Sequence, residues 1–157
     1  MLWTIGSSNL YGIVLLAQLS WSIETLEPTT KNQEATRASI LFLEALDQGQ
    51  ADILAGLGTD PFIFDGRLVK TRTEINNFWQ QLLKKHSGEL DRQTKARLSI
   101  VNYQTAVAKF GRPPKSWVYL NLRKCKFAIV TFEKRNGMLL ILQKSGRDSW
   151  RVAGVTD

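Results

Sequence analysis

The sequence predicts an α+β domain in which helices pack on a curved, mainly antiparallel sheet that forms a cone with a central pocket. Three observations carry this prediction. Apolar residues recur at helical spacing before residue 86 and alternate from Ala96 onward. Turn signals such as the segment 111–114 separate the apolar segments of the second half. Short loops between successive strands favour antiparallel pairing, because parallel neighbours need long crossover connections.

The first helix is expected over residues 31–48. Thr30 and Gln33 have the spacing of a capping box, and apolar residues follow at helical intervals. Gly49 stands where a helix commonly ends in a left-handed residue. A shorter helix is expected over residues 51–57.

The stretch 61–79 predicts a short strand, an acidic turn and a capped amphipathic helix. Phe62 to Phe64 form the apolar strand, and Thr71 with Glu74 forms a second capping box. His86, the single histidine, falls in the last helical turn, where a positive charge favours the helix dipole. We therefore expect His86 to have a structural role at the helix end.

The second half of the chain is expected to form five strands. Their ranges are 97–109, 116–123, 126–134, 138–144 and 149–155. Residues 127–132 and 138–142 are apolar on both faces, so the middle of the sheet should be covered on both sides. The helices cover one side, and a second copy of the chain is an economical cover for the other, which predicts a homodimer through the sheet.

Residues 1–22 read as a signal peptide or an N-terminal extension. The apolar run Leu10 to Leu19 is followed by a small-x-small pattern at Ser20 to Ser22, although no Lys or Arg precedes Lys31. We accordingly favour a secreted or periplasmic location over a cytoplasmic one. Residues 23–30 then form a short linker, and residues 31–157 form the domain.

Charge divides the chain into two parts. Residues 1–91 carry seven Lys and Arg against eleven Asp and Glu, and residues 92–157 carry fourteen against three. The basic half suggests an anionic contact, for which the candidates are Arg112, Lys115, Arg123, Lys124 and Lys126. Nucleic acid and an anionic membrane surface are both compatible with this charge, but a solvated outer face of the sheet explains it more simply.

One cysteine and one histidine limit the chemistry that the chain offers. Cys125 has no partner for an internal disulfide, and the usual zinc sites need several thiolates or imidazoles. We expect neither a metal nor a cofactor.

The element order resembles the nuclear-transport-factor-2-like (cystatin-like) superfamily, which includes ketosteroid isomerases and polyketide cyclase-like proteins. The resemblance covers residues 31–157 and rests on the stretch Phe62 to Trp79 and the closing DSWRVAGVTD. It implies an apolar pocket, for which the expected lining residues are Phe62, Phe64, Trp79, Tyr103 and Tyr119. In the isomerases of this superfamily an aspartate after the first strand is the general base, and Asp65 stands in that place.

Asp65 has two interpretations. As a catalytic base it would be desolvated beside Phe62 and Trp79, with its pKa raised. As the first residue of an Asp-Gly pair it would simply close a turn. The tyrosine and second aspartate of the isomerase site have no equivalents here, because the first helix lacks Tyr and residues 126–144 contain only Glu133 as an acid.

The predicted fold, the charge distribution and the resemblance are compatible with three functions. The preferred one is a non-enzymatic module that binds a small apolar or anionic ligand or a protein partner. The second is an acid–base enzyme of the isomerase, dehydratase or cyclase type that uses Asp65. The third is an exported or membrane-tethered assembly domain.

Overall fold

The structure is a computed structural model that describes residues 22–25, 30–85, 95–132 and 137–157. The predicted signal peptide up to residue 21, and His86 at the helix end, lie outside the described residues. Within the described ranges, no helix is both long and apolar enough to span a membrane.

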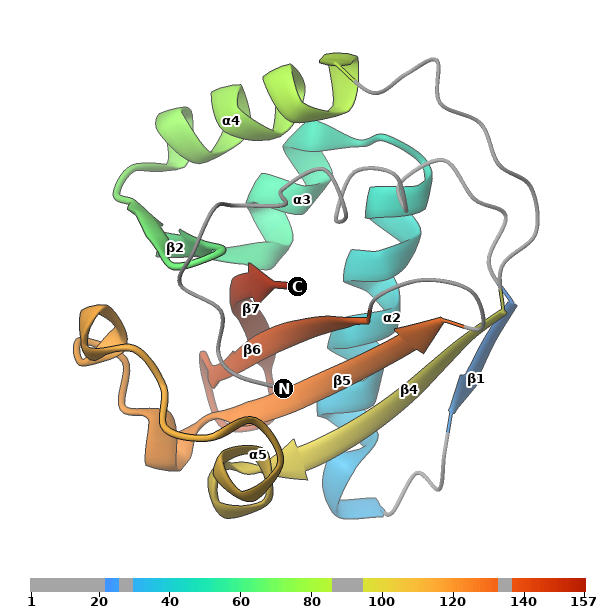
Figure 1. The fold of residues 1–157 in the computed structure, drawn as a ribbon. Coiled ribbons are helices and arrows are strands. Elements are labelled where there is room, and N and C mark those ends of the chain that lie inside the picture. Colours follow the sequence, from blue (N-terminus) through green and yellow to red (C-terminus); the bar gives the residue numbers. More distant parts are fainter. Residues whose placement is uncertain (1–21, 26–29, 86–94, 133–136) are drawn as a thin grey trace.

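A seven-stranded sheet in the order β1-β4-β5-β6-β7-β2-β3 forms the centre of the domain (Figure 1). Its strands are β1 (Ser22–Thr25), β2 (Gly58–Phe64), β3 (Arg67–Val69), β4 (Lys95–Asn102), β5 (Lys126–Phe132), β6 (Met138–Lys144) and β7 (Trp150–Thr156). Strands β4 to β7 pair antiparallel, whereas β1 joins β4 and β2 joins β7 in parallel. The expected α+β class with a mainly antiparallel sheet is confirmed.

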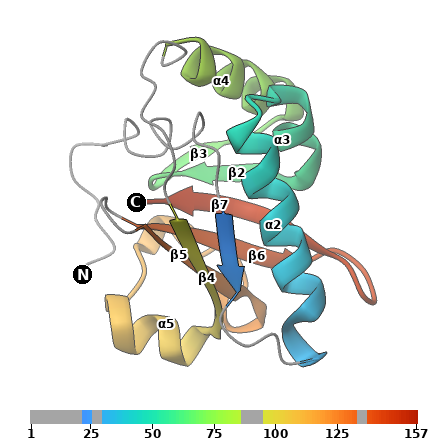
Figure 2. The same cartoon turned by 90° about the vertical axis from the view of Figure 1, so that its right-hand side faces the viewer.

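Helices lie on both faces of this sheet, as Figure 2 shows for α2 and α5. The α-helices of the described ranges are α2 (Gln33–Asp47), α3 (Ala51–Leu57), α4 (Arg72–Lys85) and α5 (Tyr103–Phe110). Three short 3₁₀ turns complete the described elements: η1 (Thr30–Asn32), η2 (Lys115–Trp117) and η3 (Leu122–Lys124). The first three helices enclose the larger core with one face of the sheet, and α5 encloses a smaller core with the other.

The two predicted capping boxes have different outcomes. At α4 the Glu74 backbone N–H donates to Thr71 Oγ1 (3.3 Å), and the Thr71 N–H donates to Glu74 Oε2 (3.1 Å), so this box is confirmed. At α2 the turn η1 precedes the helix and Asn32 stands at the N-cap, where its side chain makes no capping bond and its Oδ1 accepts from Lys126. The Thr30 side chain lies outside the described part of the structure, so the box of Thr30 and Gln33 stays a prediction.

The predicted strand 97–109 is wrong in its second half, where the chain leaves the sheet and forms α5. Asn102 ends β4, and its Oδ1 accepts a hydrogen bond from the Thr105 backbone N–H (2.9 Å), which is the geometry of a helix N-cap. Ala106 and Phe110, four residues apart, are buried on one side of the helix. An apolar pair at this spacing fits a short helix as well as a strand.

The predicted strand 116–123 is wrong throughout, because this segment forms η2, a turn and η3. Trp117 and Leu120 are buried and lie three residues apart, which places both on the inner side of a 3₁₀-like turn. Val118 and Tyr119 between them are exposed. A strand would bury every second residue, whereas here two exposed residues stand between two buried ones.

The middle of the sheet is buried on both faces, as predicted. Phe127 and Ile141 face the smaller core, whereas Val130 and Leu140 face the larger one. The cover of the second face comes from α5 and the segment 111–125 of the same chain. The homodimer therefore stays a prediction. The argument for it, that a second copy would cover this face of the sheet, no longer applies, because the same chain covers the face.

Part of the expected linker belongs to the sheet. Residues 22–25 form β1, which pairs in parallel with β4 from Ser22 opposite Lys95 to Thr25 opposite Leu98. The described domain thus begins before residue 31.

Gly154 should be intolerant of a side chain. It lies in β7 between Ile63 of β2 and Ile141 of β6, and an added Cβ would stand 2.8 Å from the Ile63 Cβ and 3.2 Å from the Ile141 Cδ1. We expect Gly154→Ala to lower the free energy of unfolding by about 1–3 kcal/mol, as overpacked cores do.

The matched control for Gly154→Ala is Gly56→Ala. Gly56 lies in α3, where an added Cβ meets no atom within 4 Å. This change should raise the free energy of unfolding by roughly 0.5–1 kcal/mol, because alanine loses less backbone entropy in a helix. Urea denaturation of both variants measures the two effects, and equal signs would contradict the packing at Gly154.

Candidate functional site

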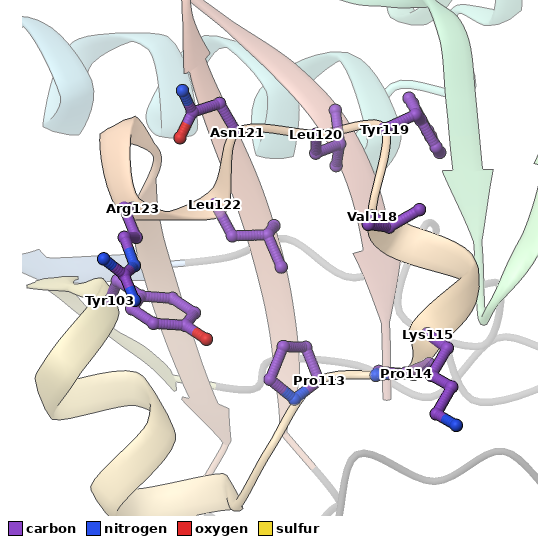
Figure 3. A pocket seen from close by; sticks show the side chains of 10 residues that line it. All are labelled: Tyr103, Pro113, Pro114, Lys115, Val118, Tyr119, Leu120, Asn121, Leu122 and Arg123. Atoms are coloured by element: carbon purple, nitrogen blue, oxygen red, sulfur yellow. The ribbon is translucent and has the colours of Figure 1, made fainter.

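An open hollow of about 710 Å³ lies over the second face of the sheet, between the start of α5 and the segment 111–125 (Figure 3). We call it the α5 hollow. It is lined by Tyr103, Pro113, Pro114, Lys115, Val118, Tyr119, Leu120, Asn121, Leu122 and Arg123. Apolar groups, hydrogen-bond donors and two cations therefore meet in one place, and no acidic residue is among the lining residues.

The wall of the hollow is held by its own hydrogen bonds. Successive i to i+3 backbone bonds run from Trp117 to Pro114 (3.1 Å) and from Leu120 to Trp117 (3.0 Å). The Trp117 and Leu120 side chains are almost fully buried in the smaller core, at 1% and 5% exposure. This anchoring fixes the backbone of the wall, so the hollow is formed without a ligand.

Tyr103 forms the other side of the hollow. Its ring packs against Phe127 of β5 with the centroids 6.3 Å apart, and Figure 3 shows its hydroxyl directed toward Pro113 and Leu122. Tyr103 thus offers a hydrogen-bonding group above an apolar floor.

Tyr119 is half-exposed on the far wall. Burial, with a smaller contribution from Cys125, raises the pKa of the Tyr119 phenol to about 12. The hydroxyl stays protonated at physiological pH, and it therefore keeps its capacity to donate a hydrogen bond to an anionic oxygen.

The electrostatic surroundings of the hollow are positive. Residues 92–132 contain nine Lys and Arg and no Asp or Glu. Five of these cations are exposed on α5 or in the segment that follows it: Lys109, Arg112, Lys115, Arg123 and Lys124. Two of the five predicted anion contacts, Lys115 and Arg123, line the hollow, and Arg112 and Lys124 lie next to lining residues in the chain.

Lys126, the fifth predicted anion contact, is held on another part of the surface. Its Nζ donates to the Lys31 carbonyl and to Asn32 Oδ1, both at 2.7 Å, and lies 5.1 Å from the centre of the Trp150 ring. Desolvation, together with the charges of Lys31 and Lys144, lowers the pKa of Lys126. These contacts fix the start of α2 to β5, which is a structural role.

Three of the five expected pocket residues fill the larger core. Phe62, Phe64 and Trp79 have 0% exposure and pack on one another, with the Phe64 and Trp79 rings 4.8 Å apart in an edge-to-face arrangement. Phe42 of α2 adds a further edge-to-face contact to Trp79 at 5.9 Å. Only Tyr103 and Tyr119 of the predicted set line the α5 hollow.

Asp65 occupies the two-residue turn between β2 and β3. Asp65 and Gly66 have φ values of +43° and +82°, the left-handed geometry of a primed hairpin turn. The Asp65 N–H donates to the Val155 carbonyl (2.8 Å), and Thr156 Oγ1 donates to Asp65 Oδ1 (3.1 Å). The turn-closing interpretation is confirmed, and the catalytic role stays a prediction.

A second hollow of about 470 Å³ lies between β3 and α4. Its lining residues are Arg67, Leu68, Val69, Lys70, Glu74, Asn77, Phe78 and Gln81. Asp65 lines neither this hollow nor the α5 hollow. Within the described ranges, no three His, Cys, Asp or Glu side chains gather as they would to hold a metal ion.

The sequence alone missed Pro113, Val118 and Leu122 as lining residues, because it predicts a turn at residues 111–114 and a strand over 116–123. One signal for the observed structure was present, since the spacing of Trp117 and Leu120 fits a 3₁₀ turn.

Comparison with known proteins finds a distant similarity to a solved structure. No family model and no curated protein matches the chain. Among solved structures, a crystal structure of a domain of unknown function with a cystatin-like fold, from Nostoc punctiforme PCC 73102, matches with a TM-score of 0.43 and 19% identity. The match covers 82% of this chain and 77% of that one.

Asp65 should tolerate asparagine better than alanine. Asparagine adopts positive φ readily, and its amide oxygen can still accept from Thr156. Asp65→Ala loses both properties and should reduce the free energy of unfolding by about 1 kcal/mol relative to Asp65→Asn. Urea denaturation measures the difference, and an equally stable alanine variant would contradict the role of Asp65 in the turn.

The same asparagine variant should change the pH dependence of stability. Burial, and to a smaller extent the Asp65 charge, raise the pKa of Asp157 above its ordinary value of 3.8. The folded state therefore holds the Asp157 proton more tightly, so this group's contribution to stability is lost as the pH rises through the raised pKa. Asp65→Asn should lose less stability than the wild type over that rise, and parallel pH profiles would contradict this.

Cys125 should be unreactive in the folded protein. Burial raises the pKa of its thiol to about 11, and Sγ donates to the Asn121 carbonyl at 3.5 Å. Because the thiolate is the nucleophile, iodoacetamide at neutral pH should label Cys125 at least about a hundredfold more slowly in buffer than in urea. Glutathione in the same two solutions is the control, and labelling that urea does not accelerate would contradict the buried site.

Proposed function

We propose that this domain is a non-enzymatic binding module whose α5 hollow takes a small anionic ligand with an apolar part. The observation that carries the proposal is the composition of the hollow. Lys115 and Arg123 supply positive charge, and the apolar surface comes from Pro113, Val118 and Leu122.

The hydrogen-bonding groups of the hollow favour an anion over a cation. The Tyr103 and Tyr119 hydroxyls and the Asn121 amide offer donors, whereas the described lining contains no carboxylate. Hydrogen bonds to a charged acceptor are stronger than neutral ones, which favours a carboxylate, sulfonate or phosphate group on the ligand.

The other two functions have less support. An acid–base enzyme would need Asp65 in a cavity beside a second polar group, and Asp65 lies instead in a hairpin turn with Thr156 as its side-chain partner. The exported or tethered assembly domain depends on residues 1–22, of which only Ser22 is described. Both remain predictions.

Anilinonaphthalenesulfonate, an aromatic anion whose fluorescence rises in an apolar site, is a suitable first probe. We expect it to bind the wild-type protein and Arg123→Gln to weaken its binding at least about tenfold, since a hydrogen bond to a charged group contributes about 1.5–3 kcal/mol. Fluorescence titration at low salt measures the dissociation constants.

The matched control is Lys70→Gln, which removes a cation from the second hollow and should leave probe binding unchanged. An uncharged anilinonaphthalene separates charge from apolar contact, and the wild type should bind it more weakly. Equal effects of the two glutamine variants would place the probe elsewhere and overturn the proposal.

A further inference from the structure

The segment 111–125 presents an apolar tip beside the α5 hollow. Val118 is 85% exposed, nearly twice as much as Ile53 on α3, the next most exposed large apolar residue among those described, at 46%. Tyr119, adjacent to it, is 40% exposed. Burying such surface in an apolar phase is favourable, so this tip is the strongest candidate for a contact surface among the described residues.

The tip is rigid. Trp117 and Leu120 on either side of it are buried in the smaller core, and the Val118 N–H donates to the Lys115 carbonyl at 3.2 Å. Holding the side chains in place before contact reduces the entropy lost on binding. An exposed valine on a pre-formed turn is therefore available for insertion without rearrangement.

Cations flank the tip in the chain. Lys115 lies three residues before Val118 in a 3₁₀ turn, where residues at this spacing lie on the same side. Arg112 precedes the turn and Arg123 and Lys124 follow it, all exposed, and no acidic residue lies between residues 92 and 132. The tip is thus complementary to a partner that has negative charge at its surface and an apolar layer below that surface.

We infer that this tip docks the domain on an anionic lipid bilayer, with Val118 and Tyr119 entering the interface and the surrounding Lys and Arg contacting lipid phosphates. Aliphatic and tyrosine side chains flanked by cations are the composition of interfacial membrane contacts. The docking surface shares Lys115, Val118, Tyr119 and Arg123 with the lining of the α5 hollow, but it needs no ligand in the hollow.

Nucleic acid is the competing anionic partner, and the side chains favour it less. Binding to single strands uses exposed aromatic faces on which bases stack. Here Trp117 is 1% exposed, and the most exposed apolar group, Val118, is aliphatic and offers no stacking face, so Tyr119 at 40% exposure is the one aromatic face that the tip offers to a base.

Co-sedimentation with lipid vesicles tests the inference. The full chain should bind vesicles of equal parts phosphatidylcholine and phosphatidylglycerol, and it should bind phosphatidylcholine vesicles much more weakly. Val118→Asp should reduce binding at least about tenfold, because the apolar burial is lost. Lys115→Gln and Arg123→Gln each remove one cation that lines the α5 hollow beside the tip or across from it, and each should reduce binding to the anionic vesicles about fivefold.

Two matched controls lie on the opposite face of the sheet. Ile53→Asp makes the same kind of change on α3, and Arg37→Gln removes an exposed cation from α2. Both should bind vesicles as the wild type does. Circular dichroism of every variant confirms that each is folded.

Three outcomes would overturn the inference. They are equal binding to neutral and anionic vesicles, equal loss in Val118→Asp and Ile53→Asp, and binding to a single-stranded oligonucleotide with no binding to vesicles. Retained binding of anilinonaphthalenesulfonate in a protein that fails to bind vesicles would leave the proposed function intact, so the two failures are distinguishable.

Discussion

Strands β5 and β6 lie in the middle of the sheet and are apolar on both faces, and the arrangement of the other elements follows from this constraint. Phe127 of β5 faces one side and Val130 the other, and neither side can face water without a large loss of hydrophobic stabilisation. Three helices close the larger core. The smaller core is closed by one short helix and an irregular segment anchored by Trp117, and the turns of that segment leave the α5 hollow at the surface.

The sequence predicted the regular layer better than the irregular one, for a physical reason. Periodic burial identifies a helix such as α4, whose capping box at Thr71 and Glu74 also marks its start. Irregular structure has no period. In the segment 111–125 alternate and i+3 spacing both fit the apolar residues, and the decision depended on contacts with β5 and β6 that only the fold supplies.

Asp65 illustrates a second limit of the sequence. It stands after an apolar strand, a position from which a carboxylate can enter a cavity or close a turn. Its φ of +43° and its bond from Thr156 show that it closes the turn, and neither is visible in the residue order. The candidate site instead lies on the opposite face of the sheet from Phe62 and Phe64, the residues that the family resemblance suggested.

The elements on the two faces of the sheet differ in charge. The helices of the larger core come from the half of the chain in which acidic residues outnumber basic ones, and the α5 hollow comes from the stretch 92–132, which has no acid. A general need for solubility would be met by mixed charges, as on α2 and α4. The positive charge of this stretch, together with an exposed valine and two tyrosines, is the observation on which the proposed negative partner rests.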